Sequence, residues 1–435
     1  MHVREPSRET PIGGDADVIV CGGGPAGIAA AIAAARTGAK TRLLEVNGCL
    51  GGVWTAGLLS WLFEMDQPGI TREITAELDR RGARKNLCSH STDKYAYDVE
   101  AMKILLDEMI LAAGVEVHLH TRLTASLVEN GKIQAVLTES KSGREAWTAK
   151  CFVDASGDGD LAARSGCGFD MGKPNTGGLQ PFTFMGLVTA GDIDALRPFL
   201  VFTDTFRHDS FLGPTAHFLK ALKDSGVEPS YHAPTLFHLR DNLLALMMNH
   251  EYGVSPINER DVTRATLHGR AEIHQAVNGL RARGGPWKDL LLVATPEQIG
   301  TREGRRIHGR YTVTADDMRI GARHEDGVCL VNYWIDVHST DSKKGKGFEE
   351  EPFKTQPYEI PLRALCARDL DNLMMAGRCI SGDFLSHSSY RVTGVAVALG
   401  QAAGATSAEA ARQNIPPADV PPDRLKELLK AIFTR

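Results

Sequence analysis

Short apolar runs alternate with a helix-like segment near the N-terminus. Asp17–Cys21 is an apolar run that suits a strand buried on both faces, and Lys40–Leu44 is a second one. Between them, Pro25 opens an alanine-rich stretch that runs to Arg36 and is closed by Gly38, which predicts a helix. Together these segments predict a strand–helix–strand unit whose small-residue helix can pack closely on a sheet.

The same patterns continue along the chain. Helical spacing predicts helices over residues 98–113, 261–281 and 392–413. Alternation or short apolar runs predict strands over residues 115–123, 133–139, 146–155, 331–338 and 371–377, with a turn at Asn130-Gly131. Residues 166–358 are less regular and include a charged loop at 339–353. The simplest architecture is a nucleotide-binding domain made from residues 1–170 and 363–435, with a substrate domain, residues 171–362, inserted between them.

Composition narrows the class of protein. The chain has 435 residues, 43% of them apolar and 24% charged, which is typical of a globular protein. A net charge of −5 argues against a nucleic-acid binder. The polar N-terminus does not resemble a signal peptide, and glycines interrupt the one long apolar window, residues 16–35, so no membrane segment is expected. Eight cysteines without a CxxC pair suit reduced thiols and a cytoplasmic location.

A glycine cluster follows the first predicted strand. Gly22, Gly24 and Gly27, with Pro25 and Ala26 between them, fit the GxGxxG pattern, and Glu45 ends the next strand. This spacing and context are typical of a dinucleotide site. The glycines would permit a tight turn and a close approach of the backbone to a pyrophosphate at a helix N-terminus, and the glutamate would bind a ribose. The alternative is a glycine-rich turn that binds no ligand.

Three further blocks of small residues accompany this fingerprint. They are Gly48–Thr55, Lys150–Asp160 and Asn372–Asp383, and the last is followed by glycines from Gly394 to Gly404. The four blocks, in this order, resemble FAD-dependent oxidoreductases of the glutathione-reductase fold, which are related to fumarate reductase flavoproteins. The resemblance covers roughly residues 15–60, 95–170 and 295–412.

The resemblance implies an α/β protein that binds FAD. It implies a Rossmann-like FAD-binding domain of the glutathione-reductase type with an inserted α+β substrate domain. The implied FAD-binding residues are Gly22, Gly24, Pro25, Ala26, Gly27, Glu45, Gly51, Gly52, Thr55, Ser156, Gly157, Asp160, Gly377, Asp383, Gly394 and Val395. Asp383 would bind ribityl or pyrophosphate oxygens, and the helix after Gly394 would point its N-terminus at the flavin. No separate NAD(P)H domain is evident, because the near-match to GxGxxA at residues 157–162 belongs to the FAD site.

Three segments carry candidate catalytic residues. If residues 331–338 form a strand, Asp336 and His338 share one face with Trp334, where the carboxylate could orient a basic imidazole; the alternative is a surface pair on an edge strand. His387 and Arg391 resemble the His-x-x-x-Arg of fumarate reductase flavoproteins, which implies a substrate-side or flavin-side role; the alternative is a structural arginine.

A basic run around Arg302, residues 301–310, could contact substrate or flavin, or could tie the inserted domain to the core through salt bridges. His118 and His120 have no third ligand spaced nearby, so no metal is expected.

These features predict an FAD-dependent oxidoreductase that takes hydride from a C–H bearing oxygen or nitrogen on a small polar molecule. His338 or His387 would take the accompanying proton, Arg391 would anchor the substrate, and oxygen or an external acceptor would reoxidise the flavin. Two alternatives remain: a flavin-dependent reductase or monooxygenase, and a flavin-binding redox sensor or subunit without catalysis. No nucleic-acid or membrane partner is expected, and the sequence does not indicate the oligomeric state.

Overall fold

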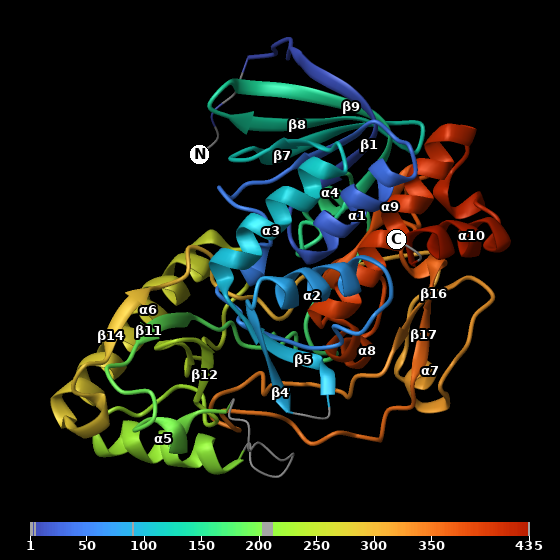
Figure 1. Ribbon diagram of the computed structural model, residues 1–435. Coiled ribbons are helices and arrows are strands. Elements are labelled where there is room, and N and C mark those ends of the chain that lie inside the picture. Colours follow the sequence, from blue (N-terminus) through green and yellow to red (C-terminus); the bar gives the residue numbers. More distant parts are fainter. Residues whose placement is uncertain (1–2, 4–5, 89–90, 202–211, 434–435) are drawn as a thin grey trace.

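A seven-stranded sheet is built from both ends of the chain. The computed structural model describes residues 3, 6–88, 91–201 and 212–433. The strand order is β6-β2-β1-β9-β8-β7, and β18 also pairs with β9. The strands are β1 (Ile12–Cys21), β2 (Thr41–Leu44), β6 (Glu116–His118), β7 (Arg122–Glu129), β8 (Lys132–Ser140), β9 (Gly143–Asp154) and β18 (Leu373–Met375). Because β18 comes from the last third of the chain, distant segments share one sheet (Figure 1).

The centre of this sheet is parallel. β1 pairs in parallel with β2 and β9, β2 with β6, and β9 with β18, whereas β7, β8 and β9 run antiparallel. Asn130 and Gly131, both with positive φ, form the predicted turn between β7 and β8. The single strand predicted over residues 115–123 is wrong, because His120, at φ +52°, separates β6 from β7. The core is therefore of the predicted Rossmann-like α/β class.

Two small-residue helices pack side by side on this sheet. Helix α1 (Pro25–Arg36) has Pro25 in its first turn and Gly38, at φ +100°, just after its end, as predicted. Helix α9 (Thr393–Gln413) crosses it closely, since a Cβ added at Gly400 or Gly404 would lie 2.1 or 2.0 Å from a carbonyl oxygen of α1. The remaining helices near this layer are α2 (Ile70–Arg80), α3 (Val99–Ala112), α4 (Asp160–Arg164) and α10 (Pro422–Phe433).

The middle of the chain forms a second sheet. Its antiparallel order is β12-β13-β11-β14, from strands β11 (Met185–Thr189), β12 (Thr235–Arg240), β13 (Leu243–Met247) and β14 (Leu291–Ala294). Helices α5 (Leu212–Asp224) and α6 (Glu259–Arg283) lie beside it at the lower left of Figure 1. Phe184 and Val188 belong to the core of this region, while Met185 and Leu187 alternate with them and join the main core. The second sheet thus connects the two cores.

The remaining strands and helices of the described residues are shorter. They are β3 (Trp61–Leu62), β4 (Arg84–Cys88) and β5 (Ser91–Tyr97), the pair β10 (Phe169–Asp170) and β15 (Arg306–Ile307), the pair β16 (Gly327–Val331) and β17 (Tyr358–Pro361), and helices α7 (Ala315–Ile320) and α8 (Phe384–Tyr390).

The strand predicted over residues 331–338 is wrong beyond Val331. The backbone N–H groups of Ile335, Asp336 and His338 donate instead to Glu351 Oε1, the Ser388 carbonyl and Gln180 Oε1. Side chains and α8 therefore hold this segment in an irregular path, where a strand would need a neighbouring strand.

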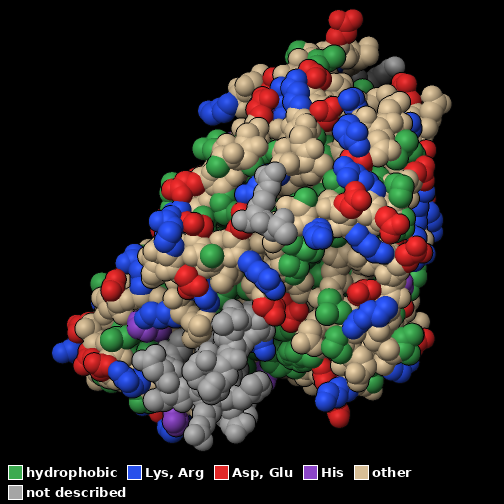
Figure 2. All heavy atoms as spheres, turned by 45° about the vertical axis from the view of Figure 1, so that its right-hand side comes forward, with side chains coloured by type: hydrophobic (Ala, Val, Ile, Leu, Met, Phe, Trp, Pro, Cys, Tyr) green, Lys and Arg blue, Asp and Glu red, His purple; other side chains and the backbone are tan. Residues whose placement is uncertain are grey.

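The surface carries side chains of both charges, and the described cysteine side chains are free thiols. Basic and acidic side chains are interspersed over the face shown in Figure 2. Seven cysteines are free, and the side chain of Cys88 lies outside the described residues. Within the described part of the chain, no helix has the length and apolar character needed to cross a membrane. The domain limits near residues 171 and 362 stay a prediction.

The contact between α1 and α9 yields a stability prediction. Gly404→Ala should lower the free energy of unfolding by about 1–3 kcal/mol, because its methyl group would overlap the Ala30 carbonyl and force the helices apart. Gly345→Ala is the control, since the nearest described atom to a Cβ there is Ser339 Cβ, at 4.0 Å. Urea denaturation of both variants measures the difference, and equal stability would contradict close helix contact.

Candidate functional site

One cavity of about 830 Å³ joins residues from both ends and the middle of the chain. Ten of the residues predicted to bind a dinucleotide line it: Gly22, Gly24, Pro25, Ala26, Glu45, Gly52, Ser156, Gly157, Asp160 and Gly377. So do four of the five predicted catalytic residues, Arg302, Asp336, His338 and Arg391. The structure therefore brings two separately predicted groups of residues to one continuous space.

The turn between β1 and α1 has room for a ligand. Gly22 has φ +105°, and a Cβ there would lie 2.4 Å from the Ala155 carbonyl oxygen. A Cβ at Gly27 would lie 1.7 Å from the Gly22 carbonyl oxygen. A Cβ at Gly24, by contrast, would meet no atom within 4 Å. The first and third glycines are thus required by the protein's own packing, and the second leaves open space in the cavity.

The N-terminus of α1 offers backbone donors to this space. Its N-cap is Gly24, no side chain caps it, and its first turn contains no acidic residue. Uncapped amides at a helix N-terminus attract anions such as a pyrophosphate. Gly51 donates its N–H to the Gly23 carbonyl at 2.8 Å, which holds the second glycine loop against the first. The residues present therefore fit a dinucleotide phosphate.

Glu45 ends β2 and lines the same cavity. Its two carboxylate oxygens accept backbone N–H bonds from Gly23 and Asn47, the latter at 2.7 Å. Burial raises the pKa of Glu45, and these backbone bonds oppose the shift. Each carboxylate oxygen keeps lone-pair capacity for a ribose hydroxyl. Glu45 thus fixes the glycine turn and also fits a sugar.

A third turn, after β9, lines the same cavity. Together with the turns that contain Gly24 and Gly51 it forms what we call the glycine cradle. The buried Asp154 carboxylate accepts N–H bonds from Ser156 at 3.0 Å and Ala162 at 2.8 Å, and so shapes this turn. Arg378, which was not predicted, also lines the cavity and pairs with Asp158 at 3.1 Å. Its Nη1 is buried and has no hydrogen-bond partner within the ranges that the structure describes. An orphaned guanidinium nitrogen at this place fits a phosphate oxygen.

The structure does not bring every predicted residue to the cavity. The six predicted cofactor residues absent from its lining are Gly27, Gly51, Thr55, Asp383, Gly394 and Val395. Asp383 instead accepts N–H bonds from Ser386 and Ala315, both at 2.7 Å, so its two oxygens cap α8 and α7. Thr55 donates to the Leu50 carbonyl, and Gly394 packs against the Glu64 carbonyl. At the start of α9, Val392, Thr393 and Ala396 face the cavity instead.

Asp336, His338 and Arg391 form a buried polar cluster at the other end. Arg391 Nη2 donates to Asp336 Oδ2 at 2.9 Å and to the Asp336 carbonyl at 2.7 Å. His338 Nε2 lies 3.3 Å from Asp336 Oδ1, and His338 is only 4% exposed. This pair is therefore buried, and the alternative of a surface pair does not hold.

Burial and neighbouring charges set the ionisation of this cluster. Burial opposes the charged form of Asp336, but His338, Arg391 and Arg302 together lower its pKa to about 2. Burial and the positive charge of Arg302 lower the pKa of His338 to about 4, although Asp336 acts in the opposite direction. At neutral pH the carboxylate is therefore charged and the imidazole neutral.

His338 has one nitrogen available to a ligand. Its Nε2 faces the Asp336 carboxylate, which accepts hydrogen bonds only, so the ring proton belongs on Nε2. Its Nδ1 is buried and has no hydrogen-bond partner among the described residues. A neutral imidazole with an open lone pair in a cavity can accept a proton from a bound molecule.

The basic run forms the salt bridges expected for it, and the predicted contact of Arg302 with substrate or flavin stays a prediction. Glu303 and Arg306 form a buried pair at 2.7 Å, and Arg305 donates to Asp160 at 3.0 Å, so these residues connect segments of the fold. Arg302 lines the cavity, and its Nη1 donates to the Pro181 carbonyl at 2.9 Å.

His387 does not line the cavity. It lies in α8, fully buried, and neither ring nitrogen has a hydrogen-bond partner among the described residues. Burial and the charges of Arg306, Arg391 and Arg378 lower its pKa well below the usual range. The structure therefore separates His387 from the cluster that holds Arg391.

Aromatic side chains that the sequence analysis did not single out line the same end of the cavity. They are Trp61, Phe63, Tyr231, Tyr333 and Phe348, together with the predicted Trp334. They come from four separate segments, so no local pattern in the sequence groups them all. His250 lies behind them, with its ring centroid 5.0 Å from that of His338.

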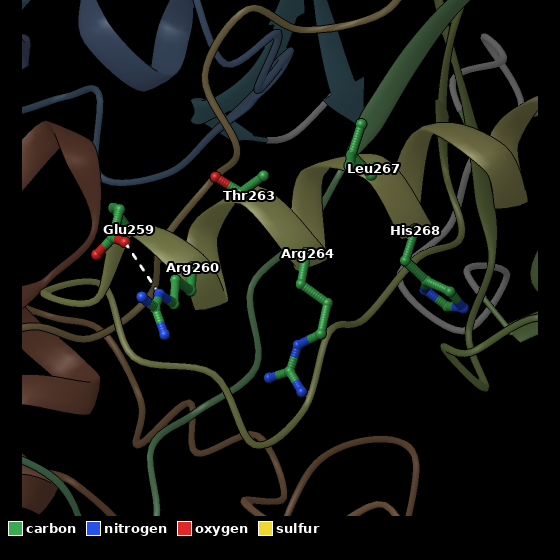
Figure 3. Close-up of a pocket in the computed structure, with 6 residues that line it drawn as sticks. All are labelled: Glu259, Arg260, Thr263, Arg264, Leu267 and His268. Carbon is green, nitrogen blue, oxygen red and sulfur yellow. Dashed lines mark ion pairs between the residues drawn. The ribbon is translucent and has the colours of Figure 1, made fainter.

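A second, open groove follows one face of α6 (Figure 3). Glu259, Arg260, Thr263, Arg264, Leu267 and His268 line it. Glu259 and Arg260 form an ion pair at 3.5 Å, and Arg264 pairs with Asp261 at 2.9 Å. His268 pairs with Glu251 at 2.8 Å, which raises the pKa of this histidine. The charged side chains of this groove therefore already have ion-pair partners. The candidate functional site is the larger of the two cavities.

The chain was compared with known protein families, curated proteins and solved structures. A family model described as FAD dependent oxidoreductase matches residues 17–429. No curated protein matches the chain. Among solved structures, a geranylgeranyl bacteriochlorophyll reductase-like protein from Thermoplasma acidophilum is 15% identical over 97% of this chain and 84% of that one, with a TM-score of 0.49. A flavin-dependent brominase is 12% identical over the same shares, with a TM-score of 0.46.

The open space at Gly24 gives a direct test of cofactor binding. Gly24→Val should yield a folded but colourless protein, because its Cβ would meet no described atom within 4 Å and its methyl groups would enter the cavity. Far-UV circular dichroism and the unfolding midpoint of the FAD-free protein should match the wild type. Gly27→Val is the contrasting variant, since it would collide with the Gly22 carbonyl and lose stability as well as flavin. Normal flavin content in Gly24→Val would show that the cofactor lies elsewhere.

Proposed function

The chain belongs to the FAD-dependent oxidoreductase family, and from this premise we propose that it oxidises a small molecule at a C–H bearing oxygen or nitrogen. The observation that carries the proposal is His338, which lines the same cavity as the glycine cradle. It is a neutral buried imidazole whose Nδ1 has no hydrogen-bond partner among the described residues. Removal of hydride from such a carbon leaves a proton on the oxygen or nitrogen, and a neutral imidazole can take it.

The residues of the cradle would hold the cofactor. Gly22, Gly24 and the N-terminus of α1 fit the pyrophosphate, Glu45 fits the ribose, and Arg378 fits a phosphate oxygen. FAD, when bound, supplies the acceptor for the hydride. The start of α9, at Thr393, would direct its positive end toward the same space. This arrangement supports the glutathione-reductase type of FAD domain that the sequence implies.

The polar cluster would position and deprotonate the substrate. Asp336 orients His338 and keeps the ring proton on Nε2, and Arg391 holds Asp336 in place with two hydrogen bonds. Arg391 Nε is buried and has no hydrogen-bond partner in the described part of the chain, so this guanidinium can still donate to a substrate oxygen. The inserted region, residues 171–362, supplies Arg302, Asp336 and His338, which is consistent with its proposed role as the substrate domain. Oxygen or an external acceptor would then take the electrons.

Anaerobic flavin bleaching tests the direction of the reaction. The holoenzyme should lose its yellow absorbance when mixed with one member of a panel of alcohols, hydroxy acids, amines and aromatic acids bearing such groups. NADH or NADPH alone should leave it oxidised. Rapid bleaching by NAD(P)H with no response to the panel would favour the reductase or monooxygenase alternative and contradict the proposal.

His338→Gln should slow flavin reduction by the active panel compound about 10²–10⁴-fold, the usual effect of losing a general base, and should retain FAD. In the wild type, the rate should stay constant near neutral pH and fall as the pH falls through about 4, where His338 gains a proton. Stopped-flow absorbance measures both. His274→Gln, on an exposed position of α6, is the matched control.

The same pKa shift predicts a stability effect that needs no substrate. In the native state His338 has a pKa of about 4, whereas in the unfolded chain its pKa returns to the ordinary histidine value of 6.5. Its contribution to stability is therefore full above that value and is lost as the pH falls toward 4. Urea denaturation across this range should show a smaller loss for His338→Gln than for the wild type, and identical losses would mean that this pKa is not shifted.

A further inference from the structure

Arg302 is a partly buried cation that forms no ion pair with a carboxylate of the described residues. Its Nη1 donates to the Pro181 carbonyl at 2.9 Å and to Thr183 Oγ1 at 2.5 Å, which are neutral acceptors. Among the described residues, no ion pair within 4.0 Å includes Arg302. Because a desolvated charge is costly unless it is paired, a partly buried arginine that lines a cavity fits an anionic ligand.

The ionised groups near Arg302 also leave one positive charge unbalanced. Burial and repulsion by Arg391 lower the pKa of Arg302 to about 10, so it remains charged at neutral pH. Asp336 is ionised and already neutralises Arg391, to which it is bound, while His338 is neutral. One positive charge is thus left over at this end of the cavity, and a single negative charge on a bound molecule would balance it.

The walls around this charge are aromatic. Ring centroids are separated by 4.6 Å for Trp61 and Phe63, and by 5.2 Å for Phe63 and Tyr333. The series continues through Trp334, whose ring lies 5.6 Å from that of Phe348. Trp334 and Phe348 are 40% and 44% exposed, although both are large aromatic side chains that line the cavity. A planar ring is the shape that such walls accommodate, through stacking and edge-to-face contacts.

Building on the proposed function, we propose that the substrate is a planar aromatic monoanion. Its charged oxygens pair with Arg302, and its ring packs against Trp334 and Phe348. This specifies further the small polar molecule expected from the sequence, because aromatic side chains line the cavity together with the polar cluster. The charged group orients the molecule, and the aromatic side chains exclude water around its ring.

Ligand binding to the oxidised holoenzyme tests this class without any turnover. Benzoate, benzamide, cyclohexanecarboxylate and acetate are titrated into FAD-loaded protein, and binding is measured by calorimetry. Benzoate should bind about ten- to a hundredfold more tightly than benzamide, which has the ring without the charge. It should also bind more tightly than cyclohexanecarboxylate, which has the charge without a planar ring, and acetate should bind most weakly.

Two variants assign the effect to residues. Arg302→Gln should weaken benzoate about ten- to a hundredfold and leave benzamide nearly unchanged. Trp334→Leu, at a partly exposed position, should weaken benzoate and benzamide together while acetate stays the same. Arg260→Gln, on the distant face of α6, is the control and should change none of these affinities.

Each outcome distinguishes this inference from the proposed function. Equal affinity for benzoate and benzamide in the wild type would overturn the anionic class, and no preference for the planar ring would overturn the aromatic class. If Arg302→Gln loses FAD while the remaining holoenzyme keeps its preference for benzoate, Arg302 serves the flavin and the inference is wrong. Binding as expected without bleaching by any panel compound would reject the proposed oxidation and leave the ligand class standing.

Discussion

The close approach of α1 to the ends of β1 and β9 is the constraint on which the rest of the structure depends. Gly22 and Gly27 stand where any Cβ would overlap backbone atoms, so the helix can start directly at the sheet edge. Its uncapped N-terminus then faces the cavity at Gly24. On its other side, Gly400 and Gly404 let α9 reach the carbonyls of α1. Small residues thus place two helix N-termini beside one space.

Charge is the second constraint, and it acts at the other end of the cavity. Asp336 is held ionised by Arg391, and the same carboxylate fixes the tautomer of His338. Since the segment that carries Asp336 and His338 is not a strand, its backbone depends on Gln180, Ser388 and Glu351 for hydrogen bonds. The segment around Asp336 is therefore coupled to Ser388 and Arg391, from the last quarter of the chain, through the polar cluster.

The features that the sequence predicted correctly are those that local residue patterns determine. The glycine fingerprint, Glu45 and the alanine-rich helices follow from local periodicity and steric limits, and the structure contains them at the expected positions. The role of Asp383 could not be predicted that way, because an acidic residue before a helix can bind a ligand or cap the helix, and here it caps. The aromatic walls were missed because Trp61, Tyr231 and Phe348 meet only through tertiary packing.

A crystal structure of the protein loaded with FAD would test the central claim most directly, namely that one cavity holds the cofactor and the polar cluster together. The account predicts that the pyrophosphate lies at Gly24 and the N-terminus of α1, with the flavin ring ending beside Arg302 and His338. A flavin ring that lies beyond Gly52, on the side away from His338, would contradict this prediction. So would FAD bound anywhere that leaves the glycine cradle empty.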